Sequence, residues 1–588
     1  MRYLLATAAA IAPLMMAAGA QAQVVISTTR STPVVTSTVG AGGTPDSVIF
    51  TTGAVLSLNT GSAVTINSSN NVSVNTGASV SMLNTASGST GILVNGGVTS
   101  NITIGGSVTL TDSIDTYPDT DTDGNLDGPF AAGSDRYGVR LTGASPLTGN
   151  ILVETTGVVV VEGNSSFGIS LESDLIGTLS NLGTVRVVGD NSIAIRALGD
   201  ISGNVHLGGT ISAQGQNSSA ITILGDVGGR LSIQGDISST GYRYSTRPSD
   251  AVIALLDPDD LFQNSTAVVI AGNVAGGLVF DRPPENTDTN SSDDDNDGIT
   301  DAQEGTARIN SYGAAPAVSI GSASQSITLG VVGTGLNAYG FINRGSINGQ
   351  GVYDGIAGNG IQIGAGGGQT VTINGGIRNE GSVVSIAREA NSRAIVLGAG
   401  VTTPEFITTG AITAAAASDT ATEVTALRIE AGANLPSFNN SGQFLASAGG
   451  GTATVTGILD LSGTLTSITN TRSMQANLSA NEDGDPITGS NTLIDVRANT
   501  TGVNILQTGT AHAATTQDPD TDGDGVSDSY EPIMTGDILL GTGADTVDIR
   551  NGAFLGDISF NDGMDTLSIS GGGVVRGALS DSVGLLDI

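Results

Sequence analysis

The sequence contains no cysteine, no tryptophan and no lysine, so all 20 of its basic residues are arginine. Without cysteine the chain has no thiol nucleophile, no thiolate metal site and no disulfide. Without lysine it has neither a Walker A phosphate loop nor a Schiff-base lysine. Basic charge is scarce, since 55 acidic residues give the 588-residue chain a formal net charge of −35. Nucleic acid is therefore excluded as a partner, because phosphate binding needs clustered cations.

Aromatic residues are also rare, at 3% of the chain, although 38% of the residues are hydrophobic. The core must therefore consist of Val, Ile, Leu, Ala and Thr, which suit pleated strands. A membrane-spanning helix needs roughly 20 apolar residues in a row, and no stretch after Ala22 approaches that length. We expect no transmembrane helix in the mature chain.

The N-terminus predicts export. Met1-Arg2-Tyr3 precedes an apolar run over 4–19, and Ala20-Gln21-Ala22 is a small-x-small cleavage site. This pattern is typical of a secretory signal peptide and is too short for a membrane anchor. The alternative is a buried N-terminal helix.

A 26-residue repeat runs through the middle of the chain. The triplets 167–169, 193–195 and 219–221 follow one another at that spacing, each after an Asn-Ser pair. A second signature, Asn-x-Gly-[Ser/Thr]-[Ile/Val], begins at Asn181, Asn343 and Asn379. Between the corners apolar and small polar residues alternate, which is the period of a β-strand. Glycine and asparagine at the corners supply the positive φ that tight turns need.

Short strands at this repeat, with no helices between them, predict an all-β fold, the parallel β-helix or solenoid. Each turn buries its inward face on the next, and we expect about twenty turns stacked about 4.8 Å apart. A string of β-sandwiches is the alternative. Hairpin signals are few, however, and the repeat is too long for one hairpin.

Three acidic segments interrupt the repeat and share one motif. Acidic residues stand at positions 1, 3, 5 and 9, glycine at position 6, and in two segments Glu at position 12, which is the calcium-loop pattern. Position 7 would contribute its backbone carbonyl. The predicted ligands are Asp119, Asp121, Asp123 and Asp127 in the first segment; Asp293, Asp295, Asp297, Ile299, Asp301 and Glu304 in the second; and Asp520, Asp522, Asp524, Val526, Asp528 and Glu531 in the third. The first segment is the weakest match, because Phe130 replaces the glutamate.

We therefore expect Ca²⁺ as the bound cofactor. These segments hold 22 of the 55 acidic residues, a density that repels itself unless cations neutralise it. The alternative is a solvated acidic insertion that binds nothing specifically. The motifs resemble the calcium repeats of thrombospondin type 3 and dockerin-like modules over about a dozen residues each. Two corners near the end of the chain also resemble calcium-binding nonapeptide repeats: Gly-x-Gly-x-Asp, which ends at Asp545, and Asp-Gly-x-Asp, which ends at Asp565. Their wide spacing favours ordinary turn corners instead.

The expected organisation alternates coils with insertions. In chain order these are the signal peptide (1–22), N-terminal coils (23–110), acidic loop 1 (111–136), coils with the 26-residue repeat (137–240), an insertion with acidic loop 2 (241–304), coils (305–510), acidic loop 3 (511–532) and C-terminal coils (533–588). Residues 249–261 within the large insertion suggest a short helix.

No catalytic motif emerges. The two histidines, His206 and His512, have no neighbouring nucleophile motif, and no GxSxG or HExxH string occurs. Paired carboxylates, which polysaccharide-cleaving β-helices need on one sheet face, lie instead in the acidic loops. We expect a protein without enzymatic activity.

The signal peptide, the cysteine-free Gly/Asn/Thr-rich coils and the Asn-x-Gly corners together resemble the passenger region of bacterial autotransporters. The resemblance implies a right-handed β-helix that is exported through an outer-membrane β-barrel translocator, its own or an associated one, to the cell surface or the medium. Such proteins end in that barrel, whereas this sequence stops at Ile588 within a glycine-rich coil. We expect the sequence to be truncated before the barrel, or the passenger to use a separate exporter.

The resemblance implies adhesion, biofilm formation or self-association, with another copy of the chain, surface glycans or matrix as partners. Two alternatives stay open. One is an exported polysaccharide- or ester-processing enzyme, and the other is a structural spacer for another domain.

Overall fold

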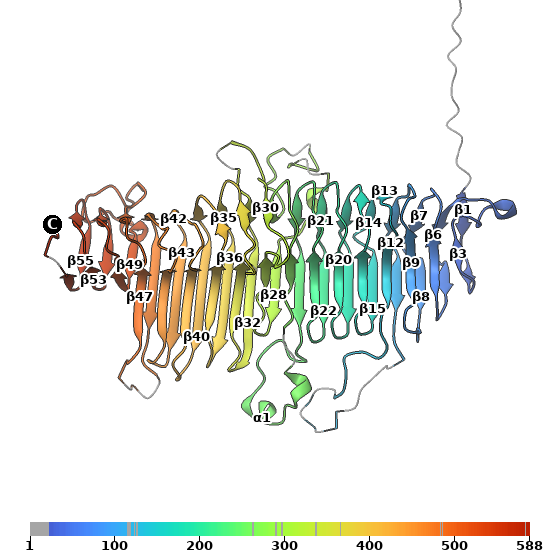
Figure 1. Cartoon of the computed structure of the whole chain (residues 1–588), viewed down its shortest axis with the longest axis horizontal. Coiled ribbons are helices and arrows are strands. Elements are labelled where there is room, and N and C mark those ends of the chain that lie inside the picture. The colour runs from blue at the N-terminus through green and yellow to red at the C-terminus, as the bar shows by residue number, and fades with distance from the viewer. Residues whose placement is uncertain are drawn as a thin grey trace, which may run out of the picture.

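The computed structural model describes residues 23–588 except 114–118, 121, 123, 125–126, 262–263, 289–290, 296–297, 336–337, 365, 482–483, 485 and 583, so the predicted signal peptide lies outside the described residues. The described chain confirms the predicted fold. It is a right-handed parallel β-helix in which three sheets of 17 strands run along one rod (Figure 1). Seventeen turns give a rod of about 80 Å. The number is below twenty because insertions lengthen some turns, as in the turn from Leu278 to Phe341, which contains loop 2. The turn from Val547 to Leu567, without an insertion, is much shorter.

Each turn contributes one strand to each sheet. Sheet A contains β1 (Gln23–Ile26), β4 (Ser47–Phe50), β7 (Val72–Val74), β10 (Ile102–Ile104), β14 (Ile151–Val153), β18 (Leu179–Asn181), β21 (Val205–Leu207), β24 (Leu231–Ile233), β27 (Leu278–Phe280), β31 (Phe341–Asn343), β35 (Ile377–Asn379), β39 (Phe406–Thr408), β42 (Ser437–Asn440), β45 (Ser467–Asn470), β48 (Asn504–Gln507), β51 (Thr546–Ile549) and β54 (Thr566–Ile569). Sheet B contains β2 (Thr29–Arg30), β5 (Val55–Ser57), β8 (Ser79–Met82), β11 (Ser107–Leu110), β15 (Val158–Glu162), β19 (Thr184–Val188), β22 (Thr210–Gln214), β25 (Asp236–Thr240), β28 (Arg308–Tyr312), β32 (Ser346–Asp354), β36 (Ser382–Arg388), β40 (Ala411–Ala417), β43 (Gln443–Gly449), β46 (Ser473–Leu478), β49 (Ile533–Thr535), β52 (Ala553–Leu555) and β55 (Val574–Arg576).

Sheet C completes the turn. It contains β3 (Val34–Val35), β6 (Ser62–Ile66), β9 (Thr90–Asn95), β12 (Tyr137–Thr142), β16 (Phe167–Leu171), β20 (Ile193–Ala197), β23 (Ser219–Ile223), β26 (Val268–Ile270), β29 (Val318–Ile320), β33 (Gly358–Ile363), β37 (Ser392–Leu397), β41 (Glu423–Ile429), β44 (Thr454–Asp460), β47 (Ser490–Asp495), β50 (Asp537–Leu539), β53 (Ile558–Phe560) and β56 (Leu579–Asp581). Two small sheets pair β13 (Leu147–Thr148) with β17 (Leu175–Ile176), and join β30 (Ile327–Leu329), β34 (Val371–Ile373) and β38 (Val401–Thr402). The described helices are α1 (Asp250–Ile253) and the short 3-10 helices η1 (Ala41–Gly43), η2 (Pro258–Asp260), η3 (Asp301–Gln303) and η5 (Asp528–Tyr530).

The 26-residue repeat is one turn of the solenoid. In sheet C Phe167 lies beside Ile193, and Ile193 lies beside Ser219. Alternate residues along these strands point into the core, so the repeat keeps the same side chains inside on every turn.

The Asn-x-Gly signature marks the corner between sheets A and B, where the asparagine is buried. The Asn343 side-chain amide donates to Asn379 Oδ1 of the next turn at 2.7 Å, and Asn343 Oδ1 accepts the Gly345 amide at 3.2 Å. The glycine is required because a Cβ on Gly381 would lie 1.9 Å from the Gly345 carbonyl oxygen. The same ladder continues from Asn440 to later turns. The corners at Asn343 and Asn440 are therefore stabilised by satisfied buried amides, whereas at Asn181 the side-chain Oδ1 is buried without a partner among the described residues.

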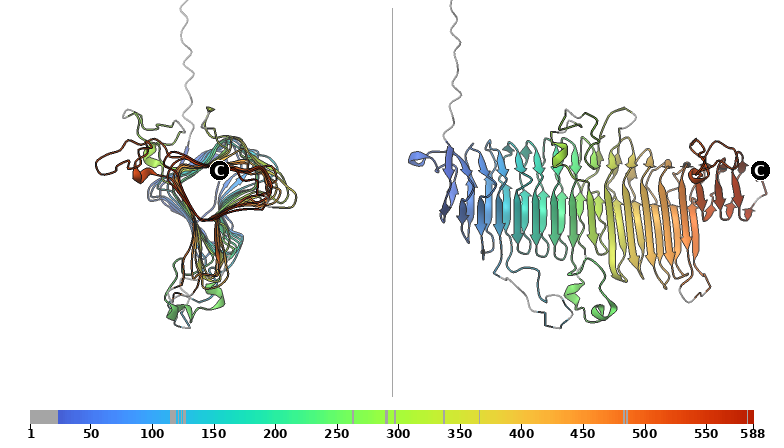
Figure 2. Two further views of the ribbon diagram at one scale, coloured as in Figure 1. Left: turned by 90° about the vertical axis from the view of Figure 1, so that its left-hand side faces the viewer. Right: turned by 180° about the vertical axis from the view of Figure 1, so that it is seen from behind.

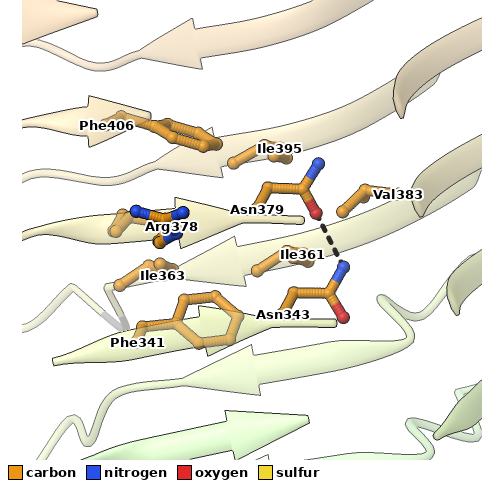
Figure 3. Close-up of a pocket in the computed structure, with 10 residues that line it drawn as sticks. Phe341, Asn343, Ile361, Ile363, Arg378, Asn379, Val383, Ile395 and Phe406 are labelled. Atoms are coloured by element: carbon orange, nitrogen blue, oxygen red, sulfur yellow. Dashed lines mark hydrogen bonds between the residues drawn. The ribbon is translucent and has the colours of Figure 1, made fainter. Parts of the chain in front are cut away.

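The core is apolar and almost fully packed. A small internal cavity of about 10 Å³ lies between Phe341, Phe406 and the Asn343–Asn379 pair (Figure 3). This volume is near the minimum for a single water. The cavity is a packing defect where phenylalanines and the asparagine ladder meet.

The cross-section has a wide three-sided part and a narrow part, which we call the foot, where sheets B and C meet (Figure 2). Small side chains let the two sheets approach there. Ser385 Oγ and Ser392 Oγ hydrogen-bond at 2.7 Å, and Ala414 and Ala446 are fully buried.

The insertions leave the rod at two edges. Loops 2 and 3 lie between sheets A and B, after β27 and β48 respectively, whereas loop 1 and the segment 241–267 lie at the foot, after β11 and β25 (Figure 2). The short helix expected at 249–261 is reduced to α1 and η2. None of the helices in the described chain is long and apolar enough to cross a bilayer.

Candidate metal centre

The three acidic loops share one hydrogen-bonded turn at the motif glycine although they lie on different turns of the solenoid. In each loop the position-1 carboxylate accepts the amide of the position-6 glycine, which has the positive φ that the motif predicts. The pairs are Asp119–Gly124 (3.2 Å, φ 97°), Asp293–Gly298 (3.1 Å, φ 91°) and Asp520–Gly525 (3.0 Å, φ 93°). The motif therefore specifies a turn as well as a set of oxygens.

The position-9 aspartate forms a hydrogen bond across each loop. Its carboxylate accepts the position-2 backbone amide, in the pairs Asp127–Thr120, Asp301–Asp294 (3.0 Å) and Asp528–Thr521 (2.9 Å). Sequence reasoning predicts this residue only as a ligand. In the structure it holds the loop closed.

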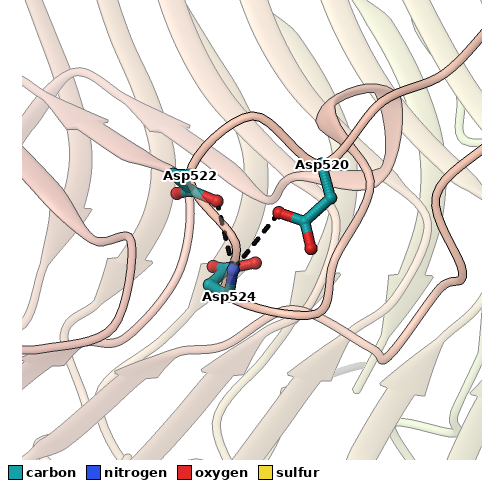
Figure 4. A group of neighbouring side chains, drawn as sticks. All are labelled: Asp520, Asp522 and Asp524. Carbon is teal, nitrogen blue, oxygen red and sulfur yellow. Dashed lines mark hydrogen bonds between the residues drawn. The ribbon is translucent and has the colours of Figure 1, made fainter.

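Loop 3 brings its first three carboxylates together. Oxygen atoms of Asp520, Asp522 and Asp524 lie within 4.8 Å of one another (Figure 4). The Asp524 amide donates to Asp520 Oδ1 at 3.2 Å and to Asp522 Oδ1 at 3.4 Å, which folds the three side chains around one point. Carboxylates that converge in this way match the oxygen-ligand preference of Ca²⁺.

Glu531, at position 12, follows η5 and completes the acidic group. Both of its carboxylate oxygens are out of solvent and have no hydrogen-bond partner among the described residues. Burial, reinforced by the charges of Asp524, Asp522 and other loop aspartates, raises the pKa of Glu531 to about 7. A carboxylate in this setting lacks a positive partner, and a divalent cation would supply one.

The pKa values of two other carboxylates in loop 3 are shifted in opposite directions. The Gly525 amide hydrogen bond is the main cause that lowers the pKa of Asp520. Burial and then the neighbouring Asp524 charge raise the pKa of Asp522. With Glu531, the predicted ligands of the loop thus include one stabilised anion and two destabilised ones.

Residues beyond the motif hold loop 3 against the rod. Val526, the predicted carbonyl ligand, is buried, and its amide donates to Asp524 at 2.9 Å. The Asn551 side chain donates to Asp524 Oδ2. Asn551 follows β51 on the next turn, and nothing in the local sequence around the loop indicates this contact.

His512, Ser527 and Asp518 lie together beside the centre, but their hydrogen bonds do not match a catalytic triad. His512 Nδ1 lies 2.8 Å from Ser527 Oγ, and Ser527 Oγ donates to Asp518 Oδ2 at 2.7 Å. In a triad the histidine lies between the acid and the nucleophile. Here the serine is fully buried and lies between the other two.

Loop 2 directs two predicted ligands toward the rod. Glu304 accepts from the buried Gln234 amide at 2.7 Å, and Asp295 lies 3.9 Å from Arg230. Ile299 lines a cavity against sheet A. Asp297 lies outside the described residues.

Loop 1 uses Phe130, where the motif would have glutamate, as a packing residue. Phe130 is 7% exposed, and the Arg243 guanidinium lies 4.2 Å from its ring centre. Arg243 also donates to the Gly128 carbonyl. Loop 1 is thereby attached to the 241–267 segment. Asp121 and Asp123 lie outside the described residues.

No protein-family model, curated protein or solved structure matches this chain. The residues of the site therefore carry the functional argument alone.

Proposed function

We propose that this chain is an exported, non-enzymatic β-helical passenger that acts at the cell surface or in the medium in adhesion or self-association. In this proposal an outer-membrane translocator carries it, and Ca²⁺ orders its acidic loops. Its partners are surface glycans, matrix or a second copy of the chain. Asp520, Asp522, Asp524 and Glu531 hold the ion in loop 3.

The observation that carries the proposal is the uncompensated acidic group of loop 3. Three carboxylates converge and a fourth, on Glu531, is buried without a partner among the described residues. Such an arrangement destabilises the loop unless a cation binds. Extracellular calcium is abundant enough for sites of moderate affinity.

The rod supports the structural part of the proposal. A chain without cysteine needs no oxidative folding step, and each turn is stabilised by its neighbours. Loops 2 and 3 leave the same edge of the rod, six turns apart, or about 29 Å. This places both complete motifs along one line.

Calorimetric titration of the whole chain with calcium chloride tests the metal site. We expect heat of binding in the wild type and its loss at loop 3 in the double variant Asp520→Asn/Asp524→Asn. Asp419→Asn, an exposed carboxylate outside the acidic loops, is the matched control. At calcium a hundredfold above Kd, binding adds about 2.7 kcal/mol to loop stability, which slows proteolytic cleavage of 511–532 about 100-fold. No heat, together with cleavage and melting that ignore EDTA, would refute the calcium site.

Adhesion requires a separate assay. Cells that display the chain are expected to sediment faster in calcium than in EDTA, or to bind a glycan or matrix surface. If displayed chains bind calcium but neither aggregate nor adhere, the spacer alternative replaces the adhesive role.

A further inference from the structure

The outer face of sheet A is covered over part of its length. Its outward residues Ser180, His206, Ser232, Val279 and Ile342 form one column of register partners. The last four are only 6%, 2%, 0% and 2% exposed. On β14 and β18, by contrast, the outward residue is partly exposed. The segments that cover the face, which we call the roof, therefore begin between β18 and β21.

The covered face has an apolar half and a polar half. Val279 and Ile342 pack against Val332 and Tyr339 and form a sealed apolar cluster. Ser232 lies in the polar half, beneath loop 2, and its hydroxyl has no partner among the described residues. A buried hydroxyl without a hydrogen bond costs about 1–3 kcal/mol, so this position requires a water or a ligand.

An open slot leads to this hydroxyl. An inner cavity of about 170 Å³ contains Ser232, His206 and Arg230, and an outer cavity of about 550 Å³ opens over β14. Both cavities share Thr178, Ser180, Gly298 and Ile299, so they form one slot between the sheet and loop 2. The outer volume lies within the range of small-ligand sites.

The lining is rich in hydroxyl and amide groups and is balanced in charge. Glu154 is the anion of the outer cavity, and Arg230 is the cation of the inner one. The hydroxyls of the lining are on Thr76, Thr155, Thr156, Thr178, Ser180 and Ser232. Thr178 and Thr156 already donate to Asn150 Oδ1 and to the Gly105 carbonyl, and Thr76 hydrogen-bonds Thr156, so these three offer mainly acceptor lone pairs. The hydroxyls of Thr155, Ser180 and Ser232 can both donate and accept, which suits a ligand that carries many hydroxyls. A charged ligand has no net opposite charge to bind here.

Two amides of the lining are held in position. Asn150 Oδ1 accepts the Thr178 amide at 2.9 Å, and Asn204 Oδ1 accepts the Arg230 amide at 3.0 Å. Both contacts join successive turns, so the solenoid itself fixes these side chains and leaves their NH₂ groups as donors. Pre-organised donors reduce the entropy lost on binding.

We propose that this slot binds an uncharged oligosaccharide, with one sugar residue in the inner cavity at Ser232 and the chain leaving over β14. The inference rests on the adhesive role proposed above and names its ligand class. The floor is a sheet face rather than a strand edge, so it offers hydroxyls and not the free backbone groups that a peptide would pair with.

The test uses the whole chain in calcium and a panel of neutral tetrasaccharides built from glucose, galactose, mannose or N-acetylglucosamine, with binding measured by saturation-transfer NMR and calorimetry. We expect at least one of them to bind. Ser180→Tyr, which fills the slot from its floor, should weaken that binding at least tenfold. Thr469→Tyr is the matched control, since Thr469 is an outward residue of the same sheet beyond the roof. Unchanged circular dichroism shows that both variants fold.

The outcomes separate the two proposals. No binding of any neutral sugar, binding restricted to uronate oligosaccharides, or equal binding by Ser180→Tyr would each overturn the slot proposal. If the protein still aggregates or adheres in calcium in those cases, the proposed function stands without the slot. If sugars bind as expected but displayed chains do not adhere, the slot stands and the adhesive role fails.

Discussion

Two buried aspartates near the end of the rod give the sharpest prediction. Asp545 and Asp565 precede β51 and β54 on consecutive turns and are 1% and 2% exposed. Asp545 Oδ1 accepts the Val503 amide at 2.7 Å, and Asp565 Oδ1 accepts the Asp545 amide at 2.8 Å. The Oδ2 atom of each is buried without a partner in the described chain. Burial, and then the Asp565 charge, raise the pKa of Asp545 to about 6.

The sign of the effect follows from this pKa. The folded pKa is above the ordinary value of 3.8, so the neutral form is favoured in the folded state. The associated stability is present at pH below about 4 and is lost as pH rises through about 6. The rise of the pKa from 3.8 to about 6 corresponds to at most about 3 kcal/mol. Asp545→Asn keeps the acceptor for Val503 and replaces the orphaned oxygen by a donor, so we expect it to stabilise these turns by about 1–3 kcal/mol at pH 8 and by almost nothing at pH 4.

Hydrogen exchange of peptides from 537–569 measures the effect, because turns of a solenoid open locally. After correction for intrinsic rates, Asp545→Asn should exchange about 5- to 150-fold more slowly than the wild type at pH 8, with no difference at pH 4. Asp562→Asn, an exposed position beside Asp565 on the adjacent turn, is the control. Faster exchange at pH 8, or an equal gain at both pH values, would refute the argument. Faster exchange only in calcium would show instead that the corner holds a cation.

Three further predictions concern the rod and its insertions. Asn440→Ala removes the hydrogen bond to Asn470 Oδ1 and the acceptor of the Gly442 amide from the buried asparagine ladder, and should lower the free energy of unfolding by about 2–3 kcal/mol in urea titrations. Asn439→Ala, which faces outward, should change it by less than about 0.5 kcal/mol. Gly381→Ala places a Cβ against a backbone carbonyl and should lower the melting temperature strongly, whereas Gly449→Ala, whose Cβ would meet only Ser479 Oγ at 3.9 Å, should not. Arg243→Ala removes the contact between loop 1 and the 241–267 segment, worth about 1–2 kcal/mol, and should speed proteolysis of loop 1 while the melting temperature of the rod stays constant.

Much of the fold follows from the sequence because its signals are local. Alternation of apolar and small polar residues has the period of a strand, and Asn-x-Gly corners repeat at one turn of the solenoid. The calcium-type motif likewise predicts its own turn, since in all three loops the first aspartate accepts the amide of the motif glycine. These features depend on residues close together in the chain.

The sites depend on contacts between turns, which local patterns do not encode. Loops 2 and 3 have equally complete motifs, but Glu304 accepts from Gln234 whereas Glu531 is buried beside its own loop. From the sequence, Phe130 is only the residue that replaces a ligand. In the structure its ring packs against the Arg243 guanidinium.

By itself the sequence determined an all-β solenoid, the corners that shape its turns and the three acidic loops that interrupt them. Only the tertiary structure decided how many turns there are, which edge each loop leaves, and which side chains lie beneath it. The physical reason is that the turns differ widely in length, as the register pairs Val547–Leu567 and Leu278–Phe341 show. The neighbours of a residue on adjacent turns are therefore set by the register of whole sheets, through the burial of their inward faces, and not by any fixed spacing along the chain.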